Sequence, residues 1–473
     1  MNLWQSITLA QFPAQTWAKH SFLLRGIGLL NAWRSQSLLV PWLEPMALLV
    51  VSAMFIVAPL VSNTYTGLLA LGCGALWLVL TLADDRPMGQ RFIPAHLLLM
   101  AYWFVACLAT AQSPVKGAAA VGLVKLTLYL LAFLLMERLM RFPQWRSVLT
   151  TVYLLTALFV TVYGIRQYLF GAEALATWVD PTSPTADQTR VYSYLGNPNL
   201  LAGYLLPTIP LGLAVLVRWR GWLPKLLAAT MTALNLICLY GTGSRGGWIG
   251  AALAVFVMGI LILYWYLPLL PPLWRVSVFP MFIGTLVTMI VLGLLFSSAF
   301  RDRALSVFAG REDSSNNFRI NVWNSVGEMI RDRPWLGIGP GNSAFNRIYP
   351  LYQRPNYSAL GAYSVYLELM VEVGLIGFSL FFWFLLTLVS RALTRLHQIR
   401  EQQDSSVFLL VGALAAMAGM LVHGFVDTVW YRPEVATVWW LLVAVVFSYG
   451  TQGSQQAAQV PNSGGLQDVS EAS

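Results

Sequence analysis

Residues 278–296 read VFPMFIGTLVTMIVLGLLF, a run that contains no charged side chain. A helix needs roughly 20 mostly apolar residues to cross the hydrocarbon core of a bilayer, so this run predicts a membrane span. Similar runs lie before and after it. They predict spans near residues 44–62, 65–83, 93–111, 117–136, 148–169, 200–217, 222–240, 246–266, 363–390, 407–426 and 435–450. We therefore expect an all-α integral membrane protein with about 12 transmembrane helices.

The composition also excludes a soluble protein of this size. Of the 473 residues, 57% are hydrophobic and only 10% are charged, and the mean hydropathy is +0.64. The net charge of +9 does not indicate a nucleic-acid partner, because the basic residues are scattered through short loops and form no stripe. The cysteines, Cys73, Cys107 and Cys238, lie in apolar runs without the spacing of metal ligands. We expect neither a metal nor a cofactor.

The lysines and arginines of the short loops set the expected orientation. If the N-terminus is cytoplasmic, the cytoplasmic loops receive roughly three times as many of them as the opposite loops, as the positive-inside rule requires. We expect cytoplasmic termini and a membrane domain over residues 44–450, in the plasma or inner membrane, with the thylakoid membrane as the alternative. Residues 1–43 then form a cytoplasmic and interfacial segment with an amphipathic helix at 21–33. The polar residues 451–473 are expected to be a disordered tail.

The longest stretch between predicted spans, residues 297–362, lies on the outer side in this orientation. Asn316 and Asn317 can cap a helix that runs to about Asp332, before Pro334 stops it. Apolar residues recur along one side of that helix, so we expect this large outer loop to be partly helical and to fold back over the membrane domain.

Two arginines on the outer side are candidates for binding a phosphate. Ser244 and Arg245 open the span at 246–266, beside glycines that let a ligand approach the positive end of a helix. Arg319 lies near the start of the loop helix, one turn before Trp323. Two guanidinium groups that face one cavity would suit a diphosphate. The structural alternatives are an arginine that reaches lipid headgroups and a solvated helix arginine.

Other polar residues near the outer ends of the spans have both structural and functional interpretations. Asn197 and Asn199, followed by Tyr204, are typical of a helix cap, which we favour over a substrate site. His423 and Asp427 are spaced to share a helix face, where they could hold a general base or join two helices.

Three ionisable residues lie inside predicted spans. Glu368 and Glu372 are one helical turn apart, and Lys125 lies within the span at 117–136. Each either pairs with an opposite charge or lines a polar path, because an ionisable group in a bilayer is costly without a role. The sequence assigns them no partners.

The order of these features resembles the O-antigen ligase and polymerase superfamily. The matching stretches, within a core of about residues 195–385, are Gly196 to Asn199, Ser244 to Gly246, Arg319 with Trp323, Asp332 to Gly341, and Tyr366 to Gly377. The resemblance implies an inverting, metal-independent glycosyl transfer from an undecaprenyl-diphosphate-linked glycan at the outer face. It also implies that Arg245 and Arg319 bind and neutralise the diphosphate.

A second resemblance extends over nearly the whole chain. Residues 191–199, 310–319 and 427–434 are similar to cyanobacterial membrane proteins associated with inorganic-carbon accumulation, which were long labelled bicarbonate transporters. This resemblance implies a physiological connection to inorganic carbon, direct or indirect.

The chain departs from the superfamily at the residue proposed there as the catalytic base. Ligases of the superfamily carry a His-Asn pair where this chain has Tyr363 and Ser364. Tyrosine, with an unperturbed pKa of about 10, is a poor base at neutral pH. Either His423 with Asp427 supplies the base, or the acceptor needs none, or this subgroup no longer performs the ligase reaction.

The two resemblances lead to different functional hypotheses. One is a glycosyltransferase that transfers or polymerises a lipid-linked glycan, and the other is a bicarbonate transporter or a non-catalytic accessory or regulatory protein in carbon accumulation. Transporters often contain inverted repeats and broken helices near mid-membrane, and the sequence indicates neither. The polar candidates gather at the outer edge, as an enzyme on a lipid carrier requires. We favour the glycosyltransferase, with membrane lipids and a lipid-linked glycan as partners and an acceptor that the sequence does not identify.

Overall fold

The computed structural model describes residues 3–10, 12, 20–21, 26–61, 63–84, 93–173, 190–308, 310–401 and 404–457. Within these residues the chain forms helices and no strand. The α-helices are α1 (Leu3–Ile7), α3 (Asn31–Gln36), α4 (Val40–Val57), α5 (Asn63–Leu82), α6 (Pro94–Gln112), α7 (Lys116–Met140), α8 (Pro143–Phe170), α9 (Pro198–Leu205), α10 (Thr208–Arg218), α11 (Trp222–Gly241), α12 (Arg245–Tyr266), α13 (Pro272–Phe296), α14 (Ser298–Leu305), α15 (Ser314–Asp332), α16 (Asn342–Ile348), α17 (Val365–Glu401), α18 (Phe408–His423) and α19 (Pro433–Ala457). Short 3₁₀-helices lie between them: η3 (Ser193–Leu195), η4 (Leu267–Leu269), η5 (Gly310–Glu312), η6 (Tyr349–Leu351), η7 (Ser405–Val407) and η8 (Val429–Tyr431).

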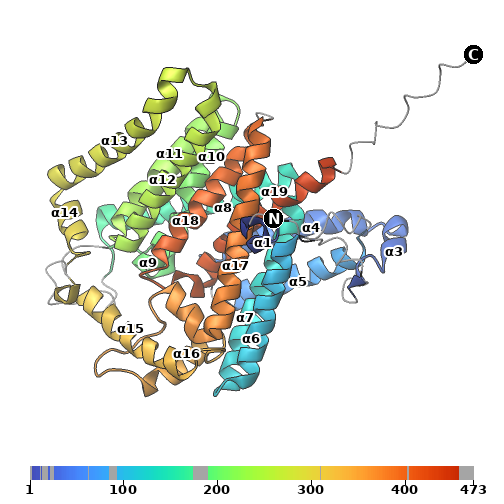
Figure 1. The fold of residues 1–473 in the computed structure, drawn as a ribbon, viewed down its shortest axis with the longest axis horizontal. Helices are drawn as coiled ribbons and strands as arrows, with labels where there is room; N and C mark the ends of the chain where they lie inside the picture. Colours follow the sequence, from blue (N-terminus) through green and yellow to red (C-terminus); the bar gives the residue numbers. More distant parts are fainter. Residues whose placement is uncertain are drawn as a thin grey trace, which may run out of the picture.

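The long helices confirm the predicted membrane protein. Among the described residues, 11 helices are long and apolar enough to cross a membrane, with α9 and α10 counted together. The apolar helix α18 is shorter, at 16 residues. Together with α18, these helices correspond to the twelve predicted spans. In Figure 1, α14, α15 and α16 lie across one end of the long helices, which we call the α15 side.

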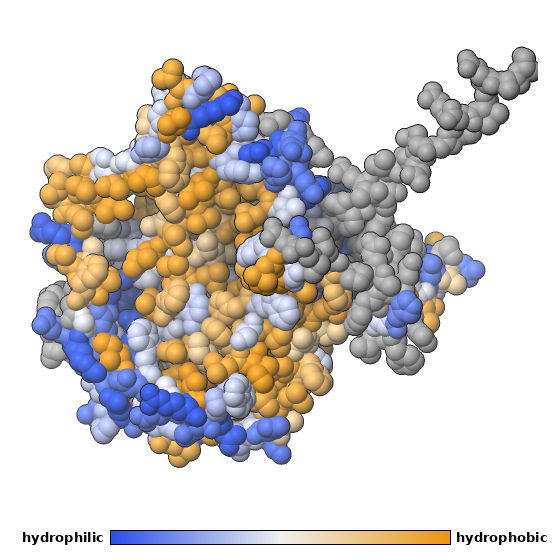
Figure 2. Space-filling model, in the orientation of Figure 1, coloured by the Kyte–Doolittle hydropathy of each residue, from blue (hydrophilic) through white to orange (hydrophobic). Residues whose placement is uncertain are grey.

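The surface follows from this arrangement. Figure 2 shows apolar residues over the long helices and polar residues gathered along the α15 side. No residue of α13 is buried, although the helix is strongly apolar. In a bilayer, lipid covers such a surface, whereas in water it would be an aggregation site. By contrast, most residues of α10, α18 and α19 are buried, and these helices form the core of the bundle.

Glycines bring α12 and α18 into close contact, and this contact positions the candidate site. A Cβ atom on Gly250 would lie 2.6 Å from the Gly419 carbonyl oxygen, so neither helix tolerates a larger residue here. One turn earlier, a Cβ on Gly246 would lie 2.8 Å from Cδ2 of His423. Small residues at this spacing let membrane helices pack backbone to backbone. The start of α12 is therefore held against the end of α18.

The loop after α13 folds back over the membrane domain, as predicted. Val322 and Met329 of α15 pack in a hydrophobic cluster with Phe345 of α16 and Ala119 of α7. The helix α15 ends at Asp332, as expected, but its N-cap is Asp313, whose carboxylate accepts a hydrogen bond from a backbone N–H. The prediction that Asn316 or Asn317 caps this helix is wrong, because Asp313 provides a capping oxygen one turn earlier.

The helix α17 is broken near its start. Gly374 has φ +66° and ψ −175°, and a Cβ there would lie 2.1 Å from the Trp335 carbonyl oxygen. The loop after α15, residues 334–341, takes up the freed backbone groups. Ile338 N–H donates to the Val371 carbonyl at 2.8 Å, and Leu375 N–H donates to the Pro334 carbonyl at 2.7 Å. The sequence did not indicate this break. Contacts with a distant segment, which local sequence does not encode, satisfy the break.

The two ends of the chain differ from the prediction in detail. Of the amphipathic helix expected at 21–33, residues 22–25 lie outside the described residues, residues 27–30 form turns, and α3 begins only at Asn31. Gly26 and Gly28 favour turns over helix in this stretch. At the other end, α19 continues to Ala457, beyond the predicted start of the tail at residue 451. Residues 458–473 lie outside the described residues.

Candidate functional site

A cavity of about 70 Å³ lies on the α15 side, where the starts of α12 and α15 meet the end of α18. Its lining includes eight residues with charged or polar side chains, which are Arg190, Asn199, Arg245, Ser315, Asn316, Arg319, His423 and Asp427. We call it the arginine cavity. The fold therefore brings together five of the predicted substrate-binding or catalytic residues, which are Asn199, Arg245, Arg319, His423 and Asp427.

Arg245 is the first residue of α12. The hydroxyl of Ser244 caps the helix and accepts a hydrogen bond from the Gly247 N–H at 3.3 Å. The guanidinium of Arg245 donates from Nη1 to the backbone and side-chain oxygens of Ser306, both at 2.9 Å, and from Nη2 to Asp313 Oδ1 at 2.8 Å. The positive end of α12 and the guanidinium both favour an anion at this point.

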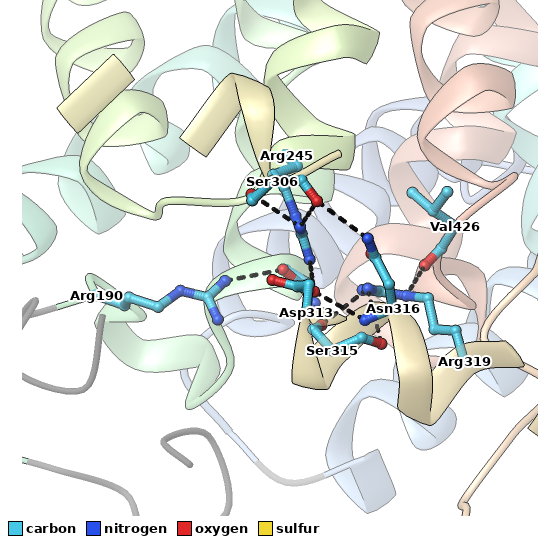
Figure 3. Close-up of polar contacts among 9 residues, drawn as sticks. Arg190, Arg245, Ser306, Asp313, Ser315, Asn316, Arg319 and Val426 are labelled. Carbon is cyan, nitrogen blue, oxygen red and sulfur yellow. Dashed lines mark hydrogen bonds and ion pairs between the residues drawn. The ribbon is translucent and has the colours of Figure 1, made fainter. Parts of the chain in front are cut away.

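Arg319 reaches the same cavity from α15. Its Nε donates to the Val426 carbonyl at 2.7 Å and its Nη1 to Ser315 Oγ at 2.9 Å, which fixes the side chain (Figure 3). Its Nη2 forms no hydrogen bond within the described residues. Burial lowers the pKa of Arg319, and the negative charge of Asp427 opposes this shift. Starting from an ordinary value above 12, the guanidinium stays charged at neutral pH.

A third arginine, Arg190, was not among the sequence candidates. Its Nη2 donates to Asn199 Oδ1 at 3.1 Å and its Nε to the Thr242 carbonyl at 3.0 Å. In Figure 3 the side chains of Arg190, Arg245 and Arg319 approach from three different segments. Asp427 is the one carboxylate among the described residues that line the cavity. With Asp313 paired to Arg245, three guanidinium groups face two carboxylates, and the remaining positive charge favours an anionic ligand with several oxygens.

His423 and Asp427 line the arginine cavity but do not share a helix face. The helix α18 ends at His423, and Gly424 is its C-cap, so Asp427 lies beyond the helix. The prediction of an i,i+4 pair is therefore wrong. His423 is 1% exposed, and neither ring nitrogen forms a hydrogen bond within the described residues. Asp427 accepts a hydrogen bond from the Thr428 N–H at 2.8 Å through Oδ1.

Tyr363 lies outside the arginine cavity. Its ring packs edge-on against Phe318, with ring centroids 5.2 Å apart, and its backbone has φ +50°. Burial and, to a smaller extent, the nearby charge of Asp427 raise the pKa of Tyr363 to about 12. The phenol is therefore protonated at neutral pH, and the structure does not place it where it could act as a base.

The remaining candidates take structural positions or line a different cavity. Asn197 caps α9 and accepts hydrogen bonds from the N–H groups of Asn199 and Leu200, which confirms the capping interpretation. Tyr204 is buried against Tyr153 in the core. Ser244 and Trp323 do not line the arginine cavity, and Glu368 lines a second cavity.

The segment that contains Arg245 and Arg319 is similar to a known protein family. Residues 211–382 match the family model of O-antigen ligase. The matched segment contains Arg245 and Arg319 and ends before His423 and Asp427. No curated protein matches the chain. The match covers less than half of the chain and shows that this core is similar to O-antigen ligases.

Two site features lie outside the O-antigen ligase match. Arg190 and Asn199 precede the matched segment, and His423 and Asp427 follow it. One sequence feature could have identified Arg190 as a site residue. It lies directly before residues 191–199, the stretch that contains the helix cap. Sequence gave no indication that its side chain turns back toward Asn199, because that contact depends on the fold of η3.

Proposed function

We propose that this chain is an O-antigen-ligase-like glycosyltransferase that uses an undecaprenyl-diphosphate-linked glycan at the outer face of the membrane. The observation that carries the proposal is the convergence of Arg190, Arg245 and Arg319 in one cavity at the membrane edge. A diphosphate presents several anionic oxygens to such a cluster, and its polyprenyl chain can lie in the bilayer beside the long helices. The α15 side is then the outer side.

The arginines suit the chemistry of the transfer. The acceptor oxygen forms a bond to the anomeric carbon on the face opposite the diphosphate, and the bond from that carbon to the diphosphate oxygen breaks. The departing diphosphate keeps the electron pair, so negative charge grows on it. Arg319, which hydrogen bonds to the Val426 carbonyl and Ser315 Oγ hold in place, stabilises that charge without having to reorganise, and Arg245 does so when Asp313 shares or releases its Nη2.

The acceptor proton needs a base. His423 lines the arginine cavity with both ring nitrogens free of hydrogen bonds from the described residues, and Asp427 lines it as well. We propose His423 as the base, with the carboxylate of Asp427 stabilising the imidazolium that forms. Tyr363 does not compete for this role because it is outside the cavity and stays protonated.

A transporter or accessory protein for inorganic carbon is the second candidate function. The break in α17 at Gly374 favours it, since transporters bind ions where membrane helices are broken. Bicarbonate is also an anion that arginines could hold. However, backbone hydrogen bonds to the loop around Ile338 satisfy the break, and Gly374 does not line the arginine cavity. The glycosyltransferase accounts for the arginines, the membrane edge and the family match together.

The test compares lipid-linked glycans in cells that lack the protein and carry wild type, Arg319→Ala or Arg331→Ala. Arg331 lies exposed on the same helix, outside the cavity, and is the matched control. We expect a lipid-linked glycan to accumulate without the protein, and wild type and Arg331→Ala, but not Arg319→Ala, to clear it. Membrane insertion is checked for each variant. Identical glycans in all strains would refute the enzyme, and bicarbonate flux in proteoliposomes would then test the second candidate.

A further inference from the structure

Arg319 and Asp427 carry opposite charges and line the same cavity, yet they form no ion pair within the described residues. The two charges are close enough to interact, because the negative charge of Asp427 opposes the lowering of the Arg319 pKa by burial. Opposite charges attract more strongly in a shielded cavity than in water, so two such side chains are expected to pair. Other contacts must therefore hold them apart.

Those contacts come from residues 424–428, the segment that joins α18 to η8, which we call the 424–428 link. The Val426 carbonyl accepts a hydrogen bond from Arg319 Nε at 2.7 Å (Figure 3). The Thr428 N–H donates to Asp427 Oδ1 at 2.8 Å. Both groups belong to the backbone, so the positions of the two charged side chains depend on how the link is anchored.

The 424–428 link is anchored to the start of α17 at both of its ends. At the first end, the Gly424 carbonyl accepts from the Val365 N–H at 2.7 Å. At the other end, the Thr428 hydroxyl accepts from the Ser364 N–H at 3.1 Å. The Gly424 anchor uses backbone atoms only. The Thr428 anchor depends on a side chain, and it lies next to Asp427.

Glu368 supports the Thr428 anchor. The Thr428 hydroxyl donates to Glu368 Oε2 at 3.5 Å, and the same oxygen accepts from the Ala362 N–H. Between Ala362 and Ser364 lies Tyr363, whose φ of +50° is uncommon for a residue with a side chain. Such a conformation persists only where the surroundings hold it. Glu368 and Thr428, each 6% exposed, fix the N–H groups on both sides of it.

We propose that Thr428 is a positioning residue of the arginine cavity. Its hydroxyl anchors the 424–428 link, so that Asp427 is kept from pairing with Arg319 and both charges remain available to ligands. Thr428 acts through the Asp427 carboxylate and the Val426 carbonyl. The roles that follow rest on the proposed function: Arg319 meets the diphosphate of the donor, and Asp427 meets the imidazolium of His423.

Loss of the anchor has a defined consequence. Without it, the peptide between Asp427 and Thr428 can rotate and release the Asp427 carboxylate. Arg319 Nη2 forms no hydrogen bond within the described residues, so it offers the released carboxylate a partner. An ion pair there would occupy the edge of the guanidinium that an anionic ligand needs, and anion binding would weaken.

The experiment uses full-length protein in nanodiscs. Thr428→Val removes the hydroxyl with little change of shape, and Thr428→Ser keeps it. Thr437→Val is the matched control, because Thr437 is also buried and its hydroxyl donates to the Pro433 carbonyl at 2.8 Å within α19, outside both cavities. Calorimetry measures the affinity for inorganic pyrophosphate. Hydrogen exchange with mass spectrometry measures the mobility of residues 424–431 without ligand.

We expect Thr428→Val to bind pyrophosphate about five-fold more weakly than wild type, the range of one lost hydrogen bond. Thr428→Ser and Thr437→Val should bind like wild type. Amides of the 424–428 link should exchange faster in Thr428→Val than in the other three proteins. When Asp427→Asn is combined with Thr428→Val, the affinity should equal that of Asp427→Asn alone, because the competing charge is gone.

Two results would overturn the positioning role. One is equal pyrophosphate affinity in Thr428→Val and wild type, and the other is a Thr428→Ser variant that binds as weakly as Thr428→Val. Failure of the proposed function gives a different result. A wild type that binds pyrophosphate but transfers no glycan would refute the transferase and leave the role of Thr428 intact. A wild type that binds no pyrophosphate would refute the donor site, and unchanged exchange in Thr428→Val would then overturn the anchor as well.

Discussion

Arg245 Nη2 and Asp313 Oδ1 lie 2.8 Å apart, in an ion pair that joins the first residue of α12 to the N-cap of α15. The Arg245 side chain is 10% exposed and that of Asp313 is 17% exposed, so the pair is shielded from solvent. The carboxylate occupies the guanidinium edge that a diphosphate oxygen would use. A donor must therefore displace Asp313 or share Arg245 with it.

Asp313→Asn is expected to tighten pyrophosphate binding by about two- to five-fold, the range of a modest ion pair. Asparagine caps helices as well as aspartate, so α15 should remain intact while the competing charge is lost. Calorimetry on protein in nanodiscs measures the change. Asp332→Asn, at the other end of α15, is the control and should bind like wild type. Weaker binding by Asp313→Asn would mean that the ion pair holds Arg245 in place for the ligand.

Arg190→Ala is expected to weaken pyrophosphate binding about ten-fold or more, because each charge-assisted hydrogen bond contributes about 1.5–3 kcal/mol. Arg190→Lys should recover little of this loss. A single ammonium group cannot keep both the Asn199 and the Thr242 contacts that orient the guanidinium. Arg166, an exposed arginine of α8, provides the control as Arg166→Ala. Equal affinities in the Arg190 and Arg166 variants would remove Arg190 from the site.

His423→Asn is expected to lower the rate of glycan transfer by about 10²- to 10⁴-fold, as loss of a general base does. Pyrophosphate binding should be unchanged. Because the ring nitrogens of His423 have no hydrogen-bond partner among the described residues, the substitution leaves no protein group unpaired. Transfer rates are measured with donor in excess, so that only the chemical step is compared. A variant as fast as wild type would show that the acceptor needs no base or that another group supplies it.

The sequence predicted the features that depend on local composition. The 11 helices long enough to span a membrane follow from the length of apolar runs, and the cap at Asn197 follows from a short polar side chain at a helix start. The end of α15 at Asp332 follows from Pro334, which cannot continue a helix.

The sequence did not predict features that depend on contacts between distant segments. Arg190 joins the site because the chain turns back at η3 and brings its side chain to Asn199. The break at Gly374 is stabilised by backbone hydrogen bonds to the loop around Ile338. Asp427 was predicted to share a helix with His423, but α18 ends one residue before Gly424. In each case, packing against another element decides between conformations that the local sequence allows.

Tyr363→Phe is expected to leave the pH dependence of transfer unchanged near neutrality and to alter stability only in alkali. Burial raises the pKa of Tyr363 from 10.0 to about 12, so between these values the unfolded chain has lost a proton that the folded chain retains. Stability then falls as the pH rises through this window. Thermal unfolding between pH 9 and 12 should show a smaller loss for Tyr363→Phe than for wild type. A changed pH–rate profile near pH 7 would instead return Tyr363 to the list of reacting groups.

Gly374→Ala is expected to destabilise the protein severely, by an amount on the order of several kcal/mol, because it combines backbone strain with a steric clash. Its φ of +66° disfavours any side chain, and a Cβ would lie 2.1 Å from the Trp335 carbonyl oxygen, which belongs to backbone and cannot rotate away. Gly284→Ala in α13 is the control, since nothing lies within 4 Å of a Cβ there and alanine favours helix. Thermal unfolding in nanodiscs should show a large decrease in Tm for Gly374→Ala and none for Gly284→Ala. Equal melting temperatures would show that the loop around Ile338 and the start of α17 can separate without loss of stability.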